Sequence, residues 1–322
     1  MTEMDLTSRM LHLRQIPVAA LLPPPVLRKI AGALRPRTFE DGAIVLRQGA
    51  PLDAMYLLTD GTLHLDKDGR PFSDLVAPQT VGFLPIIARL DTPYDATAKG
   101  EARALELDTD TLLEIFDDHF ELTAATLRYI AERLYFELRE LPESMLGIPP
   151  ADMGPIPAHP IDLVERILLT RRISGFATAN VNALAVLARQ VVEARPAAGE
   201  RIWSEGDASG RVLFLVAGTI RCETSDGRAF TYGPGTGVGG LEAIAERPRW
   251  YTASAATDVV GFWGETADLV DLFEHQPRMA MDFIAMLARA QLGLLARKST
   301  LGRDPLAAAR DVSRLGAVKV GA

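Results

Sequence analysis

The sequence contains the same pattern twice, at a nearly constant distance along the chain. The segment DLTSRMLHLRQI from Asp5 aligns with DLVERILLTRRI from Asp162, 157 positions later. Four glycines keep this spacing, with Gly42, Gly49, Gly61 and Gly82 aligning with Gly199, Gly206, Gly218 and Gly239. Repetition at a fixed period indicates that one structural unit is built twice. The length of 322 residues also suits two domains.

Each copy has the same order of predicted elements. Amphipathic helices open the copies at about residues 5–35 and 162–194, and short alternating segments bounded by glycine follow. Asp68-Gly69 and Asp226-Gly227 predict tight hairpin turns. One long apolar helical period closes each copy, at Thr111–Leu138 and Leu269–Leu295. Helices around many short strands predict an α+β unit built on a small β-barrel.

The predicted boundaries follow from the repeat and from proline content. The segment 144–160 contains five prolines and two glycines, which favours an extended linker. We therefore predict a first domain at 1–143, a linker at 144–160, a second domain at 161–298 and a tail at 299–322. The end of the chain from Ala296 has six basic and two acidic residues, and we expect a short helix near Leu306–Leu315.

Composition restricts the class of protein. A net charge of −8 and a pI near 5.3 argue against a protein that coats nucleic-acid phosphates. Cys222 is the lone cysteine, which favours a reducing compartment, and no export signal or apolar run of membrane-spanning length is apparent. The histidines lack metal-ligand spacing, and no set of nucleophile, base and orienting group is recognisable. We expect a cytoplasmic protein that is not an enzyme, without a metal, a cofactor, DNA or a membrane as partner.

The glycine-bounded segments resemble a known family. FEDGAIVLRQG followed by MYLLTDGTL, and AAGERIWSEGD followed by LFLVAGTI, are similar to cyclic-nucleotide-binding domains of the catabolite activator and kinase regulatory-subunit type. The resemblance covers nearly everything outside the linker and tail. It implies two double-stranded β-helix (jelly-roll) barrels, each flanked by N- and C-terminal helices. Gly42, Gly49 and Gly61 stand where such a barrel turns tightly, and glycine adopts positive φ without strain.

In that family one short cassette holds the ligand. A G-E-[LA]-A run opens a helix whose N–H groups face the cyclic phosphate, and its Glu accepts from the ribose 2′-hydroxyl. A P-R-x-[AT]-[TS] run supplies the arginine that pairs with the phosphate. An anion suits both a helix N-terminus and a guanidinium group, so these residue types match the ligand's chemistry.

The cassette of the first copy lacks these groups. Phe83 stands at the Glu position, Tyr94 at the Arg position, and Pro85 at the position whose N–H would meet the phosphate. We predict that the first domain does not bind a cyclic nucleotide in the family's way.

The cassette of the second copy keeps part of the pattern. Pro248-Arg249 and Thr252 have the family's spacing from Gly239, so Arg249 is the candidate phosphate ligand and Leu241 to Ala243 the candidate amide nest. Gly240 replaces the Glu, and Glu242 replaces a small residue, where its carboxylate could serve the ribose or repel the phosphate. Trp250 and Tyr251 follow the arginine and could stack on a base.

Two functions remain open from the residues. One is a regulatory protein that senses cAMP or cGMP through the second domain and signals to a protein effector. The other is a structural or interaction module that has lost both ligand sites. An Arg249 side chain in an open pocket would favour the first, and a pocket occupied by Trp250 or Glu242 would favour the second. Too few residues follow the last long helix for a winged helix-turn-helix, so we expect no direct gene regulation, and the apolar long helices are candidates for homodimer formation.

Overall fold

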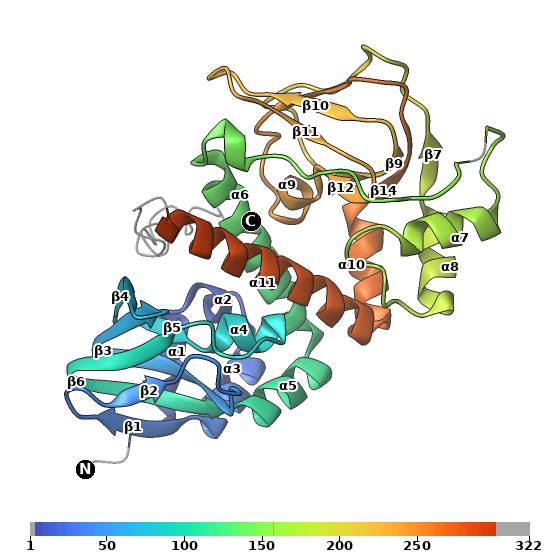
Figure 1. Cartoon of the computed structure of the whole chain (residues 1–322). Coiled ribbons are helices and arrows are strands. Elements are labelled where there is room, and N and C mark those ends of the chain that lie inside the picture. The colour runs from blue at the N-terminus through green and yellow to red at the C-terminus, as the bar shows by residue number, and fades with distance from the viewer. Residues whose placement is uncertain (1–3, 157, 301–322) are drawn as a thin grey trace. The chain divides into compact units, whose positions relative to one another are not determined.

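The computed structural model describes residues 4–156 and 158–300, and the helix expected near Leu306–Leu315 lies outside them. The described residues form two antiparallel barrels with flanking helices, drawn in blue to cyan and in yellow to orange in Figure 1. The predicted α+β class and the tandem repeat are confirmed.

The first copy folds as one six-stranded antiparallel sheet with the path β1-β6-β3-β4, to which β2 and β5 are added. Its strands are β1 (Arg35–Phe39), β2 (Ile44–Leu46), β3 (Ala54–Lys67), β4 (Arg70–Val76), β5 (Gln79–Val81) and β6 (Asp95–Asp108). Its helices are α1 (Leu6–Arg14), α2 (Pro17–Ala20), α3 (Pro24–Ala33), α4 (Phe83–Ala88), α5 (Thr109–Asp118) and α6 (Phe120–Arg139). The Asp68-Gly69 hairpin is confirmed, since both residues have positive φ between β3 and β4.

The second copy has two four-stranded sheets, with the orders β11-β10-β13-β8 and β12-β9-β14-β7. Its strands are β7 (Val192–Ala194), β8 (Arg201–Trp203), β9 (Arg211–Ala217), β10 (Ile220–Glu223), β11 (Ala229–Tyr232), β12 (Thr236–Val238), β13 (Thr252–Ala255) and β14 (Val260–Glu265). Its helices are α7 (Leu163–Arg171), α8 (Val181–Gln190), α9 (Gly240–Ile244), α10 (Thr266–His275) and α11 (Pro277–Thr300). The Asp226-Gly227 hairpin joins β10 to β11, as predicted.

The long closing helices are each divided in two, which corrects the prediction of one continuous helix per copy. In the first copy the division is at His119, whose φ is −134°. In the second copy Gln276 precedes Pro277, and a residue before proline is disfavoured in the helical conformation. The shorter helix of each pair, α5 or α10, belongs to the compact unit that contains its own barrel, whereas the longer one, α6 or α11, is divided between the two units.

A 3₁₀ turn, Glu143–Met145, stands at the start of the linker, and the other described linker residues lie outside the helices and strands. Ile148 pairs with β11, since its N–H donates to the Thr231 carbonyl at 3.1 Å and its carbonyl accepts from the Gly233 N–H at 3.0 Å. The linker is therefore paired with the edge of β11 at Ile148.

Compact units of the chain do not coincide with the predicted boundaries. One unit joins Met1–Tyr129 with Leu287–Ala322, and the other is Ile130–Met286. The second half of α6 thus belongs to the unit that contains the second barrel, and the second half of α11 to the unit that contains the first. The domain boundaries at residues 143 and 298 stay predictions.

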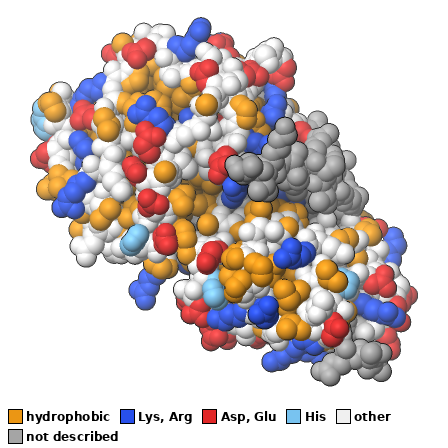
Figure 2. Space-filling model, turned by 180° about the vertical axis from the view of Figure 1, so that it is seen from behind, with side chains coloured by type: hydrophobic (Ala, Val, Ile, Leu, Met, Phe, Trp, Pro, Cys, Tyr) orange, Lys and Arg blue, Asp and Glu red, His pale blue; other side chains and the backbone are white. Residues whose placement is uncertain are grey.

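Helix α11 also has the length and composition of a membrane span over Pro277–Lys298, with a mean hydropathy of 1.4, contrary to the expectation that no segment approaches that length. Of the apolar stretch of α11, 61% is buried within the protein, as in the core helix of a folded domain. Length and apolar composition are therefore weak evidence that α11 spans a membrane. Figure 2 shows acidic and basic side chains interspersed over the face that it draws.

Gly61 illustrates why the barrel needs glycine at its repeated turns. Its φ is +85°, and a Cβ there would lie 2.6 Å from the Glu101 carbonyl oxygen and 2.9 Å from the Ala102 Cα. Its counterpart Gly218 has φ +86° and a similarly close backbone neighbour, Asp258. Both conformation and space exclude a side chain, so the repeat preserves a geometric requirement of the fold.

We predict that Gly61→Ala lowers the free energy of unfolding by about 3 kcal/mol, because a strained φ and a backbone clash coincide. Gly32→Ala is the matched control, since Gly32 lies in α3 with open space around its Cβ position and should gain about 0.5–1 kcal/mol. Urea denaturation of both variants measures the difference. Equal stability of the two would contradict the steric explanation.

Candidate ligand cassettes

The first cassette is built from α4 and the start of β6, and its interior is apolar. Gly82, with φ +88°, precedes α4, in which Phe83 and Pro85 are both buried. Phe83 stacks on Phe116 of α5, with ring centroids 6.5 Å apart. The positions that would supply a carboxylate and an amide donor therefore supply packing.

Tyr94 takes the place of the arginine in this cassette. Its ring stacks on Phe72 with centroids 6.1 Å apart, and its side chain hydrogen-bonds to the backbone of Gly82. Burial raises the pKa of Tyr94 to about 12, so the group stays neutral at physiological pH. Tyr94 therefore stabilises the turn before α4 through its hydroxyl, and it lacks the positive charge that would pair with a phosphate.

The second cassette is built from Gly239, α9 and the segment before β13. Arg249 is 4% exposed, and its guanidinium donates to the carbonyl oxygen of Gly239 at 2.7 Å and to that of Arg211 at 2.6 Å. The guanidinium carbon also lies 4.2 Å from the ring centroid of Trp203. Arg249 therefore joins the turn before α9 to strands β8 and β9.

Gly239 has a steric role in this arrangement. Its φ is +77°, and a Cβ at this position would meet the Arg249 guanidinium at less than contact distance. The glycine at this turn thus leaves room for the Arg249 side chain, whereas a Cβ at its counterpart Gly82 would meet the backbone of Ala54 and Met55.

Glu242 lies inside the second barrel. Its residue is 2% exposed, and the side chains of Tyr251 and Trp250 hydrogen-bond to it. Burial raises the pKa of the Glu242 carboxyl, while Arg249, by its charge, and these hydrogen bonds oppose the change. A carboxyl group therefore already occupies the interior beside the arginine.

Aromatic rings fill the space around Glu242. Trp250 stacks on Phe230 with ring centroids 5.3 Å apart. Tyr251, at the [AT] position of the P-R-x-[AT]-[TS] run, is 1% exposed, and its ring centroid also lies 5.3 Å from that of Phe230. Tyr232 hydrogen-bonds to Tyr251, and burial raises the pKa of both phenols well above the ordinary value. Trp250, Tyr251 and Phe230 belong to one buried cluster with Trp203 and Cys222, and Tyr232 packs against this cluster. The ring assigned to a base by sequence is therefore packed against the protein itself.

The remaining predicted residues have structural contacts. The Thr252 hydroxyl accepts from the Glu205 N–H at 3.0 Å. Within α9, Ala243 donates to the Gly239 carbonyl at 3.3 Å, and Ala245 to the Leu241 carbonyl at 2.9 Å. Gly240 is the first residue of α9. Gly239, Gly240, Leu241, Glu242, Ala243, Arg249, Trp250 and Thr252 thus lie in one region of the second barrel, and their role in binding a ligand stays a prediction.

Sequence reasoning missed the groups that hold Arg249 and Glu242 in place. Trp203, Phe230 and Tyr232 come from strands that carry no cassette motif. The sequence signal that could have found them is a difference between the two copies. Trp203 aligns with the smaller Leu46, and Tyr251 stands at the [AT] position of the P-R-x-[AT]-[TS] run. An excess of large aromatic residues in one copy indicates an interior that is filled by side chains.

Comparison with known proteins decides the family. The profile of the family "Cyclic nucleotide-binding domain" matches residues 36–119 and 195–276, together just over half of the chain. The chain belongs to the cyclic nucleotide-binding domain family. Both matched segments contain the cassettes described above, so the resemblance seen in the glycine pattern is confirmed in both copies.

Solved structures of tandem regulatory subunits are similar to this chain. The regulatory subunit of a cAMP-independent protein kinase A from Trypanosoma brucei is 17% identical, with a TM-score of 0.37, over 86% of this chain and 93% of that one. The regulatory domain of PKA from Toxoplasma gondii, crystallised with cAMP, is 16% identical, with a TM-score of 0.36, over 92% and 97%. The Trypanosoma cruzi subunit bound to guanosine is 15% identical, with a TM-score of 0.35, over 98% and 93%.

We predict that Arg249→Ala destabilises the ligand-free protein by about 3 kcal/mol, because two buried carbonyl oxygens lose a charged donor. A residue that served only a ligand would leave the stability of the ligand-free protein unchanged. Arg221→Ala is the control, since Arg221 pairs with Glu223 on the surface and should change stability by less than about 0.5 kcal/mol. Chemical denaturation without nucleotide measures both.

We predict that Glu242→Gln becomes more stabilising, relative to the wild type, as pH rises above 4.5. The folded protein keeps the Glu242 proton to higher pH than the unfolded chain, so raising the pH through this window favours unfolding of the wild type. Urea denaturation at several pH values from 4.5 to 8 measures the difference in unfolding free energy. Glu223→Gln, on the exposed β10 pair, is the control, and a Glu242→Gln difference independent of pH would refute the effect.

Proposed function

We propose that this chain is a non-enzymatic, cytoplasmic regulatory protein that acts through contacts with a protein effector, and that its second domain is held closed by its own side chains. The observation that carries the proposal is the filled interior of the second barrel. Glu242, Trp250 and Tyr251 are each no more than 5% exposed, and all three stand in the cassette that would hold the family's ligand.

Electrostatics favours the same conclusion. A cyclic phosphate carries a negative charge, and the Glu242 carboxyl lies close enough to Arg249 to interact with its charge. In its ionised form Glu242 repels a phosphate, and in either form it takes up space beside the arginine. The first cassette, with Phe83, Pro85 and Tyr94, lacks the phosphate-binding groups altogether.

A second candidate function is sensing of a cyclic nucleotide at Arg249. The supporting observation is that the guanidinium lies at the turn before α9, where the family's phosphate arginine acts. This function requires that a ligand displace the Gly239 and Arg211 contacts and move Trp250 or Tyr251 out of the barrel. The cost of breaking these contacts would be taken from the binding free energy.

We predict that cAMP and cGMP, each at millimolar concentration, leave the melting temperature unchanged. A ligand present at 100 times its dissociation constant would stabilise the folded state by about 2.7 kcal/mol, which differential scanning fluorimetry detects easily. A shift that disappears in Arg249→Lys, which keeps the charge but loses the paired donors, would support the sensor instead. A shift retained in that variant would place a site elsewhere and contradict both functions.

A further inference from the structure

Helix α6 belongs to both compact units. Residues up to Tyr129 cluster with the first barrel, and residues from Ile130 cluster with the second. One unbroken helix, Phe120–Arg139, therefore extends from the end of the first copy onto the second. The second half of this helix contacts the loop before Arg249 and the β10–β11 hairpin.

The middle of α6 holds the loop that precedes Arg249. Glu132 forms an ion pair with Arg247, whose Nε lies 3.0 Å from the carboxylate, and both side chains are less than a quarter exposed. The Tyr135 hydroxyl donates to the Pro248 carbonyl at 3.2 Å. The Arg247 guanidinium also lies 5.4 Å from the ring centroid of Phe136. Two consecutive cassette residues are thus tied to one face of α6.

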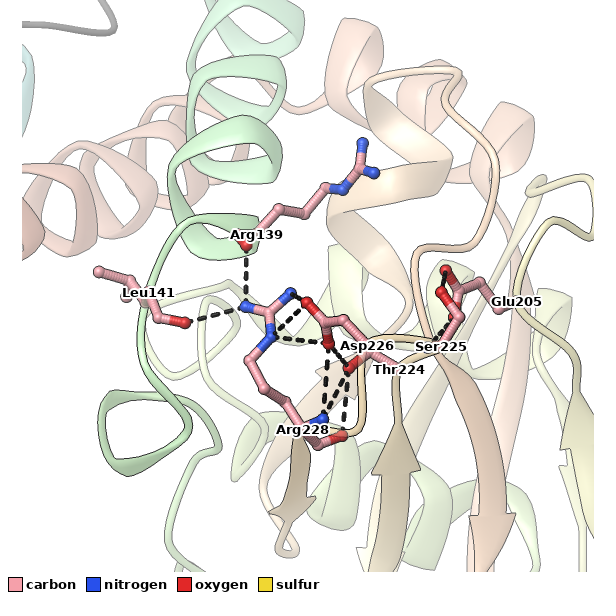
Figure 3. Close-up of polar contacts among 7 residues, drawn as sticks. All are labelled: Arg139, Leu141, Glu205, Thr224, Ser225, Asp226 and Arg228. Carbon is pink, nitrogen blue, oxygen red and sulfur yellow. Dashed lines mark hydrogen bonds and ion pairs between the residues drawn. The ribbon is translucent and has the colours of Figure 1, made fainter.

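The end of α6 is held by the β10–β11 hairpin, as Figure 3 shows. Arg228 donates to the carbonyl oxygen of Arg139, an acceptor at the C-terminus of α6, at 2.8 Å, and to that of Leu141, two residues later, at 2.9 Å. Asp226 pairs with the same guanidinium at 2.8 Å, and this hydrogen bonding lowers the pKa of Asp226 to about 2. The Arg228 guanidinium also lies 5.9 Å from the ring centroid of Trp250. The arginine that holds the end of α6 therefore adjoins the filled interior of the second barrel.

The same relation recurs in the other direction. The second half of α11 clusters with the first barrel, and Arg289 donates to the Ala88 carbonyl at the end of α4 at 2.9 Å. At the repeat spacing of 157, Arg289 is the counterpart of Glu132, and Ala88 is the counterpart of Ala245, two residues before Arg247. Equivalent positions on the two closing helices therefore contact equivalent ends of the two cassettes.

We propose that the two copies exchange their closing helices, so that each cassette is closed by the helix that follows the other barrel. Opening of the second cassette then requires release of α6 from Arg247, Pro248 and Arg228.

Hydrogen exchange of the full-length chain, measured by mass spectrometry, tests the exchange of helices. Glu132→Arg places like charges together, and amides in 239–252 should exchange about tenfold faster, whereas those in 82–92 stay unchanged. Glu132→Arg combined with Arg247→Glu restores opposite charges and should recover most of the protection. Arg289→Ala should have the converse effect, with faster exchange in 82–92 only. Glu132→Gln gives a smaller change in the same direction, and keeps the test valid should the reversed charge unfold the protein.

Arg221→Glu supplies the matched control, because it reverses a charge in an exposed pair of the same barrel and should affect neither segment. Three results would overturn the proposal. These are unchanged exchange in 239–252 with both Glu132 variants, an effect of Glu132→Arg that falls on 82–92, or an Arg289→Ala effect that falls on 239–252.

Discussion

The Arg249 guanidinium is the interaction on which the second cassette depends. It lies against the Trp203 ring and ties the Gly239 turn to the Arg211 carbonyl. A buried guanidinium is costly unless its donors are satisfied, and here backbone oxygens satisfy them. Glu242 adds an opposite charge nearby, and the aromatic cluster excludes water from both groups. Arg249, which stands where the family's arginine binds phosphate, therefore stabilises the barrel by binding backbone carbonyl oxygens of this chain.

The two copies solve one structural problem with different chemistry. Both need a positive-φ glycine before the cassette helix, and both use the side chain at the arginine position to fasten that turn. Tyr94 does so through a neutral hydroxyl at Gly82, and Arg249 through a charged donor at Gly239. The duplication therefore preserved the fastening of the turn, while the groups that would recognise a ligand diverged in each copy.

The fold was predictable because its signals are local and repeated. Glycines that need positive φ, Asp-Gly turns and apolar helical periods each specify backbone geometry within a few residues. The position of Arg249 in the cassette was predictable for the same reason. Its partners were not, because Trp203 and the Arg211 carbonyl are distant in sequence and carry no motif. The second half of α6 was unpredictable too, since Glu132 and Arg247 meet across 115 positions that alignment of the copies does not relate.

Solvent exchange of the tryptophan indole N–H groups tests the filled interior most directly. Nuclear magnetic resonance resolves them individually once Trp263→Phe has assigned one of the three. The Trp203 indole donates to the Tyr251 carbonyl at 3.1 Å inside the cluster, and the Trp250 indole interacts with Glu242. We expect both indole N–H groups to exchange only through global unfolding, with an exchange rate that rises steeply with denaturant concentration. Fast exchange at both sites in the ligand-free protein, independent of denaturant, would show an open barrel and contradict this expectation.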